Sequence, residues 1–301
     1  MNLLLAALLS PGNEAVLLGC GAAFFWGGGD FFGGMGVRSA GGSMRASLKL
    51  ILLSHCVSLS LVFALAMMLH YPQPTHHEIA WGVSCGVAAA LGLMCFYVAL
   101  AEGNMGPSAA ISGLLAAALP AAVGMMSQGA PTMMQGAGFL AAAAAIWLIA
   151  AGEHLELVSR RTLLLSFLSG ISFGIYFIGL KMSNGAGPLW AMTLSRCGSV
   201  TTTATILVAL TLLGRKSGVF EPKFGAKAFK FAMGTVLLDT TGNMMFVEAT
   251  RMGRLDVASV LASLYPASTI VLAAWVLHER PTSRQRWGMA LAIAAVVMIT
   301  L

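Results

Sequence analysis

Charged side chains are scarce in this chain. Asp, Glu, Lys and Arg make up 9% of the 301 residues, hydrophobic residues make up 58%, and the mean hydropathy is +0.84. A typical soluble domain has about 25% charged residues, which it needs to cover its surface. The composition therefore excludes a soluble domain of this size and predicts a protein of the lipid bilayer.

Cysteines are also few, and their spacing fits no metal site. All five fall inside apolar segments: Cys20, Cys56, Cys85, Cys95 and Cys197. We therefore expect buried free thiols, with no disulfide framework, no metal and no cofactor.

Three functional patterns are missing. No Walker A sequence is present, so the sequence does not indicate transport driven by ATP hydrolysis. Carboxylates are scattered and His76-His77 stand alone in a loop, so a membrane-embedded enzyme would lack its metal, phosphate or Ser/His constellation. The net charge is +6, but the basic residues form no stripe with interleaved aromatic residues. This argues against nucleic-acid binding.

The N-terminal segment lacks the marks of a secretory signal. Residues 1–10 are apolar, but they carry no basic n-region and precede no clear small-residue cleavage site. We therefore expect no cleaved signal peptide.

What the chain does have is a series of apolar stretches of about 20 residues, the length of a membrane-spanning helix. They lie near residues 16–36, 47–69, 79–101, 107–127, 132–151, 162–182, 188–213, 229–250, 256–278 and 284–301. The loops between them are short and hold no soluble domain. The prediction is an all-α integral membrane protein with ten transmembrane helices.

The chain also repeats itself. At a shift of 150 residues, the segment 96–147 aligns with 246–297 without a gap, and 12 of the 52 pairs are identical. The pattern Pro-Thr-x-x-Gln-x-x-Gly occurs at matching places in both copies, and glycine pairs extend the repeat toward the N-terminus at a shift of 151. We infer a tandem duplication, with repeats at 16–151 and 162–301.

Both repeats resemble the EamA-like repeat of the drug/metabolite transporter (DMT) superfamily. In the second repeat the resemblance lies in Asp239-x-x-x-Asn243, Ala249, Gly253, Ser263-Leu264-Tyr265-Pro266, Glu279-Arg280, Gln285 and Gly288. The first repeat departs from the pattern, with Leu115-Ala116 in place of Tyr-Pro and Gly129-Ala130 in place of Glu-Arg. The resemblance implies a cavity lined by the first four helices of each half, with the fifth and tenth helices peripheral.

An odd number of spans in each repeat makes the second copy insert upside down, which predicts two inverted five-helix repeats. Lys and Arg gather in the loops after helices 1, 3, 5, 7 and 9, whereas the other side has only Lys181, Arg251 and Arg254. The positive-inside rule then places both termini outside, although members of this superfamily are often drawn with both termini inside.

Ionisable residues inside apolar helices are the natural site candidates, because each costs several kcal/mol unless it meets a partner or a wet cavity. Asp30 lies among glycines that let a helix or a substrate approach closely. Lys181 takes its place in the second repeat, so a charge pair near the pseudo-two-fold axis is one prediction; snorkelling at a helix end is the alternative.

Asp239 and Asn243 are four residues apart, which puts them on one helix face. Arg196, whose repeat mate is Arg45, needs an acidic partner or an anionic substrate group, and Asp239 is the obvious partner. For all three residues a structural role in helix packing is the alternative to substrate binding or coupling.

Trp26 and Tyr176 could form the walls of a mid-membrane pocket, as the resemblance implies, with simple packing as the alternative. His55 could relay protons or could be a structural hydrogen-bonded residue.

Proline marks helix breaks. Tyr265-Pro266 and Pro120 each remove a backbone hydrogen bond within an apolar stretch, and such breaks can act as hinges. Glu279 matches the family pattern in the turn after the ninth apolar stretch and is expected to order this turn.

The sequence therefore predicts a multi-pass secondary transporter of the cell (inner) membrane that moves a small metabolite or drug by alternating access. The solute is amino-acid-like or another small polar or amphipathic molecule, export is the commoner direction in the family, and protons are the expected coupling partner. An uncoupled facilitator or exchanger, a membrane enzyme and a structural subunit are the alternatives, and a homodimer stays open. Loss of transport in Asp239→Asn with unchanged folding would separate a transporter from a scaffold.

Overall fold

The computed structural model describes residues 13–101, 105–150, 159–214, 224–276 and 282–300. These residues form helices joined by turns and short irregular segments, and no strand occurs among them. The helices are α2 (Glu14–Ser39), α3 (Met44–Met68), α4 (His76–Ala101), α5 (Met105–Gln128), α6 (Met133–Ala150), α7 (Arg160–Met182), α8 (Pro188–Gly214), α9 (Ala226–Met252), α10 (Leu255–Ala262), α11 (Tyr265–Val276) and α12 (Ser283–Thr300). The all-α prediction is confirmed for this part of the chain.

Within the described ranges, seven spans are long and apolar enough to cross a membrane: α2, α3, α4, most of α5, α7, α8, and α10 together with α11. The helices α6 and α12 have 18 residues each. Helix α9 has 27 residues and carries Lys230, Asp239 and Glu248 along its length. The chain is therefore a multi-pass membrane protein, and the full set of ten spans stays a prediction.

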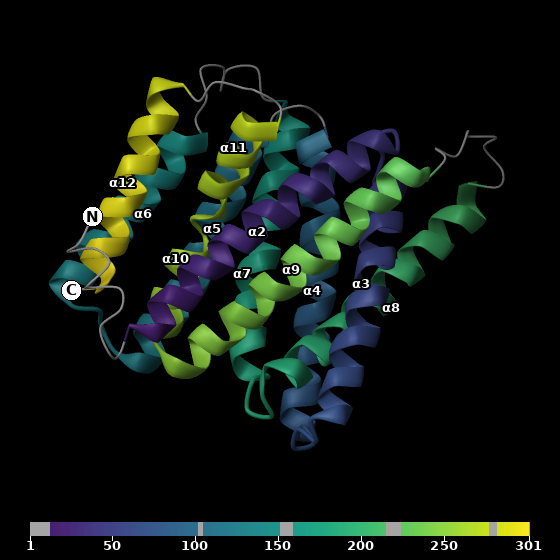
Figure 1. The fold of residues 1–301 in the computed structure, drawn as a ribbon, viewed down its shortest axis with the longest axis horizontal. Helices are drawn as coiled ribbons and strands as arrows, with labels where there is room; N and C mark the ends of the chain where they lie inside the picture. The colour runs from purple at the N-terminus through teal and green to yellow at the C-terminus, as the bar shows by residue number, and fades with distance from the viewer. Residues whose placement is uncertain (1–12, 102–104, 151–158, 215–223, 277–281, 301) are drawn as a thin grey trace.

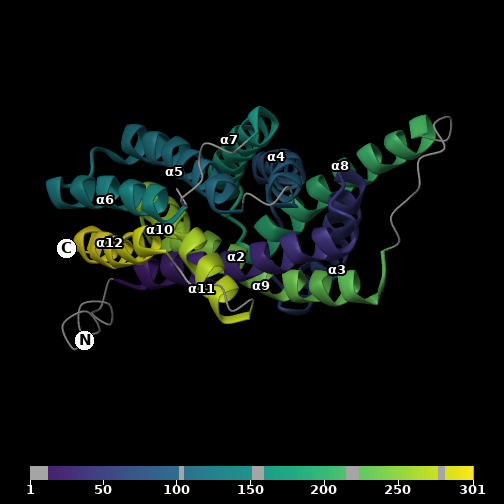
Figure 2. The ribbon, with the colours of Figure 1, turned by 90° about the horizontal axis from the view of Figure 1, so that it is seen from above.

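The helices form two rows (Figure 2). One row contains α4, α5, α6 and α7, and the other contains α2, α9, α10, α11 and α12. Helix α6 packs on α12 at one end of the molecule and α3 packs on α8 at the other (Figure 1). Between these ends, α2 packs along α9, and α4 packs along α7.

The ninth apolar stretch forms two helices. Helix α10 ends at Ala262 and α11 begins at Tyr265, directly before Pro266. Pro266 has no backbone N–H, so it cannot donate the helical hydrogen bond to the carbonyl of Ala262. The hydroxyl of Thr269 lies 3.1 Å from the Gly27 carbonyl and 3.3 Å from the Tyr265 carbonyl, which ties the start of α11 to α2.

Pro120 lies inside α5, which continues through it. The hinge roles of Pro120, Tyr265 and Pro266 stay predictions. Glu279 lies outside the described residues.

The repeated Pro-Thr-x-x-Gln pattern forms a capping box at the start of α6 and of α12. Thr132 N donates to Gln135 Oε1 (3.2 Å), and Gln135 N donates back to Thr132 Oγ1 (3.1 Å). Thr282 and Gln285 exchange the same two bonds, at 2.9 and 3.3 Å. Each box satisfies backbone donors that a helix start leaves without an intrahelical partner.

The glycine of the repeated pattern lies where α6 and α12 cross. A Cβ added to Gly138 would lie 2.7 Å from Ile299 Cγ1, and one added to Gly288 would lie 2.7 Å from Ile149 Cγ1. Glycine is thus required on both sides of this crossing, because the two backbones approach closely. The motif therefore starts each helix and sets its packing partner.

Replacing Thr282 by alanine is expected to destabilise the protein by about 1 kcal/mol, because the N-terminal donors of α12 lose a cap. Thermal unfolding of the purified protein in detergent would measure the effect. Thr205→Ala is the matched control, since Thr205 is exposed within α8 and caps no helix. Equal melting temperatures for the two variants would contradict a capping role.

The cysteines are all free, but not all are buried. Cys85 and Cys95 are buried, Cys20 and Cys197 are half-buried, and Cys56 is exposed. The prediction of a buried thiol is therefore wrong for Cys56, which lies on an outer face of α3.

Candidate functional site

A cavity lies among α2, α4, α7, α8, α9 and α11. The volume of this cavity is about 40 Å³. Its lining consists of Trp26, Asp30, Ala89, Leu93, Phe173, Tyr176, Phe177, Arg196, Asp239, Asn243 and Tyr265. A single water needs about 10–15 Å³, so the cavity admits a few waters. A larger solute requires side chains or helices to move apart.

All six residues that the sequence predicts for substrate binding or coupling line this cavity: Asp30, Asp239, Asn243, Arg196, Trp26 and Tyr176. They come from α2, α7, α8 and α9, and the structure brings them to one place. Tyr265, predicted as part of a hinge, lines it too. Their roles in binding or coupling stay predictions.

Arg196 donates hydrogen bonds to side chains on two neighbouring helices, α3 and α9. Its side chain is 1% exposed, and each of its three nitrogens donates a hydrogen bond. Nε donates to Ser58 Oγ (3.2 Å), Nη1 donates to His55 Nε2 (2.8 Å), and Nη2 forms an ion pair with Asp239 Oδ2. The predicted pairing of Arg196 with Asp239 is present, and it joins α8 to α9.

The bond from Arg196 fixes the protonation of His55. A guanidinium only donates, so Nε2 of His55 must accept and carries no hydrogen. Nδ1 then carries the hydrogen and donates to Ser199 Oγ at 2.6 Å. In this arrangement His55 is a neutral, hydrogen-bonded residue that joins α3 to α8.

Both oxygens of Asp239 have donors. Oδ2 accepts from Arg196, and Oδ1 accepts from Asn243 Nδ2 at 3.0 Å. Asn243 also donates to the Asp239 backbone carbonyl (2.7 Å), and its Oδ1 accepts from the Tyr176 hydroxyl (2.7 Å). The spacing of four residues thus gives a hydrogen-bonded pair, as expected for neighbours on one helix face.

Asp30 differs from Asp239. Among the described residues, no side chain donates a hydrogen bond to its carboxylate, which faces the cavity from α2. The neighbouring Gly29 lets α2 approach α9, since a Cβ there would lie 3.3 Å from Asp239 N. Asp30 is therefore the one cavity carboxylate that this part of the chain leaves without a donor.

Lys181 does not pair with Asp30. It lies near the end of α7, and its Nζ donates to the backbone carbonyl of Thr250 on α9. The prediction of a charge pair near the pseudo-two-fold axis is therefore wrong, because the lysine side chain bonds at its helix end. Arg45, the repeat mate of Arg196, donates through Nη2 to the Leu210 carbonyl at 2.8 Å.

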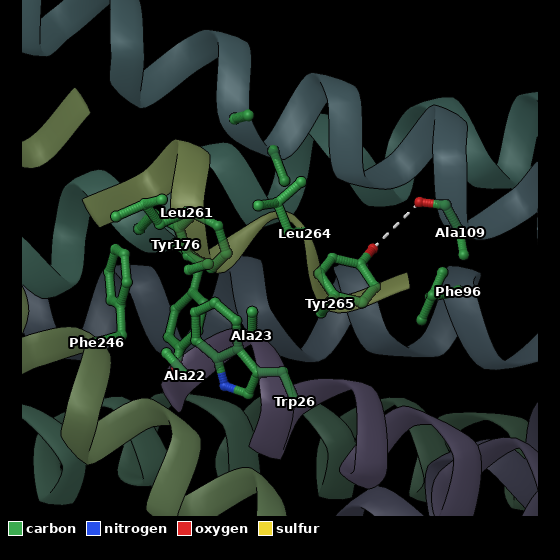
Figure 3. Packing of buried hydrophobic residues seen from close by; sticks show 14 of the residues in the cluster. Ala22, Ala23, Trp26, Phe96, Ala109, Tyr176, Phe246, Leu261, Leu264 and Tyr265 are labelled. Atoms are coloured by element: carbon green, nitrogen blue, oxygen red, sulfur yellow. Dashed lines mark hydrogen bonds between the residues drawn. The ribbon is translucent and has the colours of Figure 1, made fainter. Parts of the chain in front are cut away.

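Aromatic rings form much of the cavity wall. Trp26 stacks on Phe177 with ring centroids 4.9 Å apart and planes 6° apart, and Phe246 lies 5.3 Å from Trp26. Figure 3 shows Trp26 and Tyr176 in the buried cluster, with Tyr265 beside Phe96. The Tyr265 hydroxyl donates to the Ala109 carbonyl at 3.4 Å, which ties α11 to α5.

The sequence predictions missed the hydroxyl groups behind the cavity. Ser58 on α3 accepts from Arg196 and bonds Thr240 on α9 at 2.7 Å, and Ser199 bonds His55. The available signal is a hydroxyl inside an apolar helix, but these helices carry many such residues. No group of three or more His, Cys, Asp or Glu that could hold a metal occurs in the described ranges.

Comparison with known proteins gives a family match for a little less than half of the chain. The sequence model of the EamA-like transporter family matches residues 160–301. A solved structure described only as "Crystal structure of protein" is similar to the fold, with a TM-score of 0.72 over 95% of this chain and 98% of its own, at 13% sequence identity. At this identity the similarity concerns the fold alone. No match was found among curated proteins.

Proposed function

Residues 160–301 belong to the EamA-like transporter family, and from this we propose that the whole chain is a secondary transporter that moves a small metabolite or drug through the cavity around Asp30. The match of residues 160–301 supports a membrane protein of this transporter family. The cavity supplies a site for the solute. No observation favours catalysis or a purely structural role.

The charged side chains that line a cavity between largely apolar helices are the observation that supports this proposal most. Ionisable groups in a spanning helix cost several kcal/mol, and those that persist mark substrate or ion paths. Arg196 and Asp239 offset this cost by pairing, whereas Asp30 faces the cavity without a donor among the described residues. A scaffold has no need of such a carboxylate.

We further propose two inverted five-helix repeats that rock around the cavity. Under exchange of the halves, α2 corresponds to α7, α4 to α9, and α5 to α10 with α11. Helix α2 packs on α9, α10 and α11, and α7 packs on α4 and α5. Helix α3 packs on α8 and α6 packs on α12, so each pairs with its own counterpart. Such exchange of partners is expected of a pseudo-two-fold relation between inverted repeats.

Alternating access also needs contacts between the halves that close one side of the path. Arg254, before α10, donates to the carbonyls of Gln128 (3.1 Å) and Gly129 (2.6 Å) at the end of α5. Its Nη2 lies 2.7 Å from Asp256 Oδ2, and this hydrogen bond raises the pKa of the Arg254 guanidinium, which stays charged. We assign this cluster to the closed side of the proposed path.

Proton coupling through Asp30, export, and location in the cell (inner) membrane are the finer parts of the proposal. Asp30 has no donor in the part of the chain that the structure describes, so it can exchange a proton without breaking a bond there, whereas Asp239 cannot. An uncoupled facilitator or exchanger is the alternative.

Replacing Asp30 by asparagine is expected to abolish solute-evoked proton movement, because an amide side chain cannot bind and release the coupled proton. The measurement uses proteoliposomes with an internal pH dye and a screen of amino acids, nucleobases and amines. Glu248→Gln is the matched control, because Glu248 does not line the cavity and pairs with Arg251 near the C-terminal end of α9. An undiminished proton signal in Asp30→Asn would contradict coupling through Asp30. Counterflow of labelled solute without any proton signal would support the facilitator.

A further inference from the structure

The charges that line the cavity do not balance. The lining holds two carboxylates, Asp30 and Asp239, and one guanidinium, Arg196. His55, directly behind Arg196, is neutral by its hydrogen bonds. With both carboxylates ionised, the described part of the cavity therefore carries one uncompensated negative charge.

An anionic group would find no uncompensated positive charge among the described residues of this cavity. Three of the five N–H groups of Arg196 already donate to protein groups, and Asp239 neutralises the charge of the guanidinium. A substrate carboxylate would have to displace Asp239 from the guanidinium and would then lie in a cavity with two like charges. Such a displacement leaves a buried charge without its partner, which is strongly unfavourable.

A cationic group would find both a charge and a suitable wall. Asp30 offers a carboxylate with no donor among the described residues. Five aromatic side chains line the same space: Trp26, Phe173, Tyr176, Phe177 and Tyr265. The negative faces of aromatic rings attract cations, most strongly where water is excluded. Ala89 and Leu93 complete an apolar surface that suits a hydrocarbon body.

We propose that this cavity binds a small organic monocation, a primary amine with an apolar body, whose ammonium group pairs with Asp30. The inference rests on the proposed function, since it names the substrate class of the same site. The proposed site ranks solutes of the same shape by charge. It binds an amine more tightly than the corresponding zwitterion, and it does not bind the anion.

Three probes of nearly equal shape test the charge preference. Leucine is the zwitterion, 3-methylbutylamine lacks its carboxylate, and 4-methylpentanoate lacks its amine. Binding would be measured by titration calorimetry on the full chain in lipid nanodiscs. The expected order is 3-methylbutylamine tightest, leucine weaker by about tenfold or more, and no binding of 4-methylpentanoate.

Variants locate the binding charge. Asp30→Asn is expected to weaken amine binding by about tenfold or more while the helical circular dichroism and the melting temperature stay unchanged. Glu248→Gln, which removes a carboxylate outside the cavity, should bind the amine as the wild type does. If leucine or 4-methylpentanoate binds as tightly as the amine, if Asp30→Asn binds the amine normally, or if the amine does not bind, the inference is overturned.

Uptake of the same labelled probes into proteoliposomes separates this inference from the proposed function. Amine that binds through Asp30 but never crosses the membrane would uphold the inference and contradict transport. Leucine that is transported by a protein that does not bind the amine would uphold transport and overturn the inference.

Discussion

Arg196→Leu is expected to destabilise the folded protein by about 3–5 kcal/mol, the usual effect of removing one partner from a buried ion pair. The substitution leaves Asp239 without its cation and leaves His55 and Ser58 without the donor that orders them. Thermal unfolding in detergent, followed by helical circular dichroism, would measure the change.

A double variant, Arg196→Leu with Asp239→Leu, is the matched test. Replacing both charges by apolar residues removes the unpaired carboxylate, so most of the lost stability should return. Transport should not return, because the wall of the cavity has changed. If the single variant unfolds at the wild-type temperature, the ion pair does not hold α8 to α9 in the way proposed here.

Gly86→Val is expected to have the second large effect, a loss of about 1–3 kcal/mol or more from overpacking. Gly86 lies where α4 crosses α8, and a Cβ there would overlap the carbonyl of Ser195 and lie 2.9 Å from Ser199 N. These are backbone atoms, so no side-chain rotation relieves the clash. Because Ser199 bonds His55, the displaced α8 should also disturb Arg196 and reduce transport.

Gly136→Val is the control for Gly86→Val. A Cβ added to Gly136 on α6 meets no atom within 4 Å, and valine is slightly the better helix former. Its melting temperature should equal or exceed that of the wild type. Equal destabilisation by the two substitutions would show that glycine flexibility, rather than the α4–α8 contact, explains the result.

Helix positions follow from the sequence because membrane length and apolar composition define them strongly. The stretch predicted at 16–36 lies within α2, and the one at 188–213 lies within α8. The division of 256–278 into two helices is a tertiary effect. Pro266 cannot donate a backbone hydrogen bond, and Thr269 instead bonds the Gly27 carbonyl on α2. Whether α6, α9 and α12 cross the membrane is not determined by their length and composition.

The candidate site could be predicted as a set of residues but not as a network. Asp30, Arg196 and Asp239 stand out because charges are rare in apolar helices. Which carboxylate has donors depends on how α3, α8 and α9 pack. No spacing in the sequence could show that His55 meets Arg196 from 141 residues away. The wrong pairing of Lys181 with Asp30 has the same cause, since repeat positions do not specify where a flexible side chain bonds.

Access to the cavity from both sides of the membrane is the most direct test of the proposed transporter. Leu93 lines the cavity from α4, and a Leu93→Cys variant without the five native cysteines would be treated with a membrane-impermeant maleimide in vesicles of each orientation. Alternating access predicts labelling from either side, and a transported solute should slow both reactions. Labelling from one side only, or from neither side in vesicles that transport normally, would contradict it.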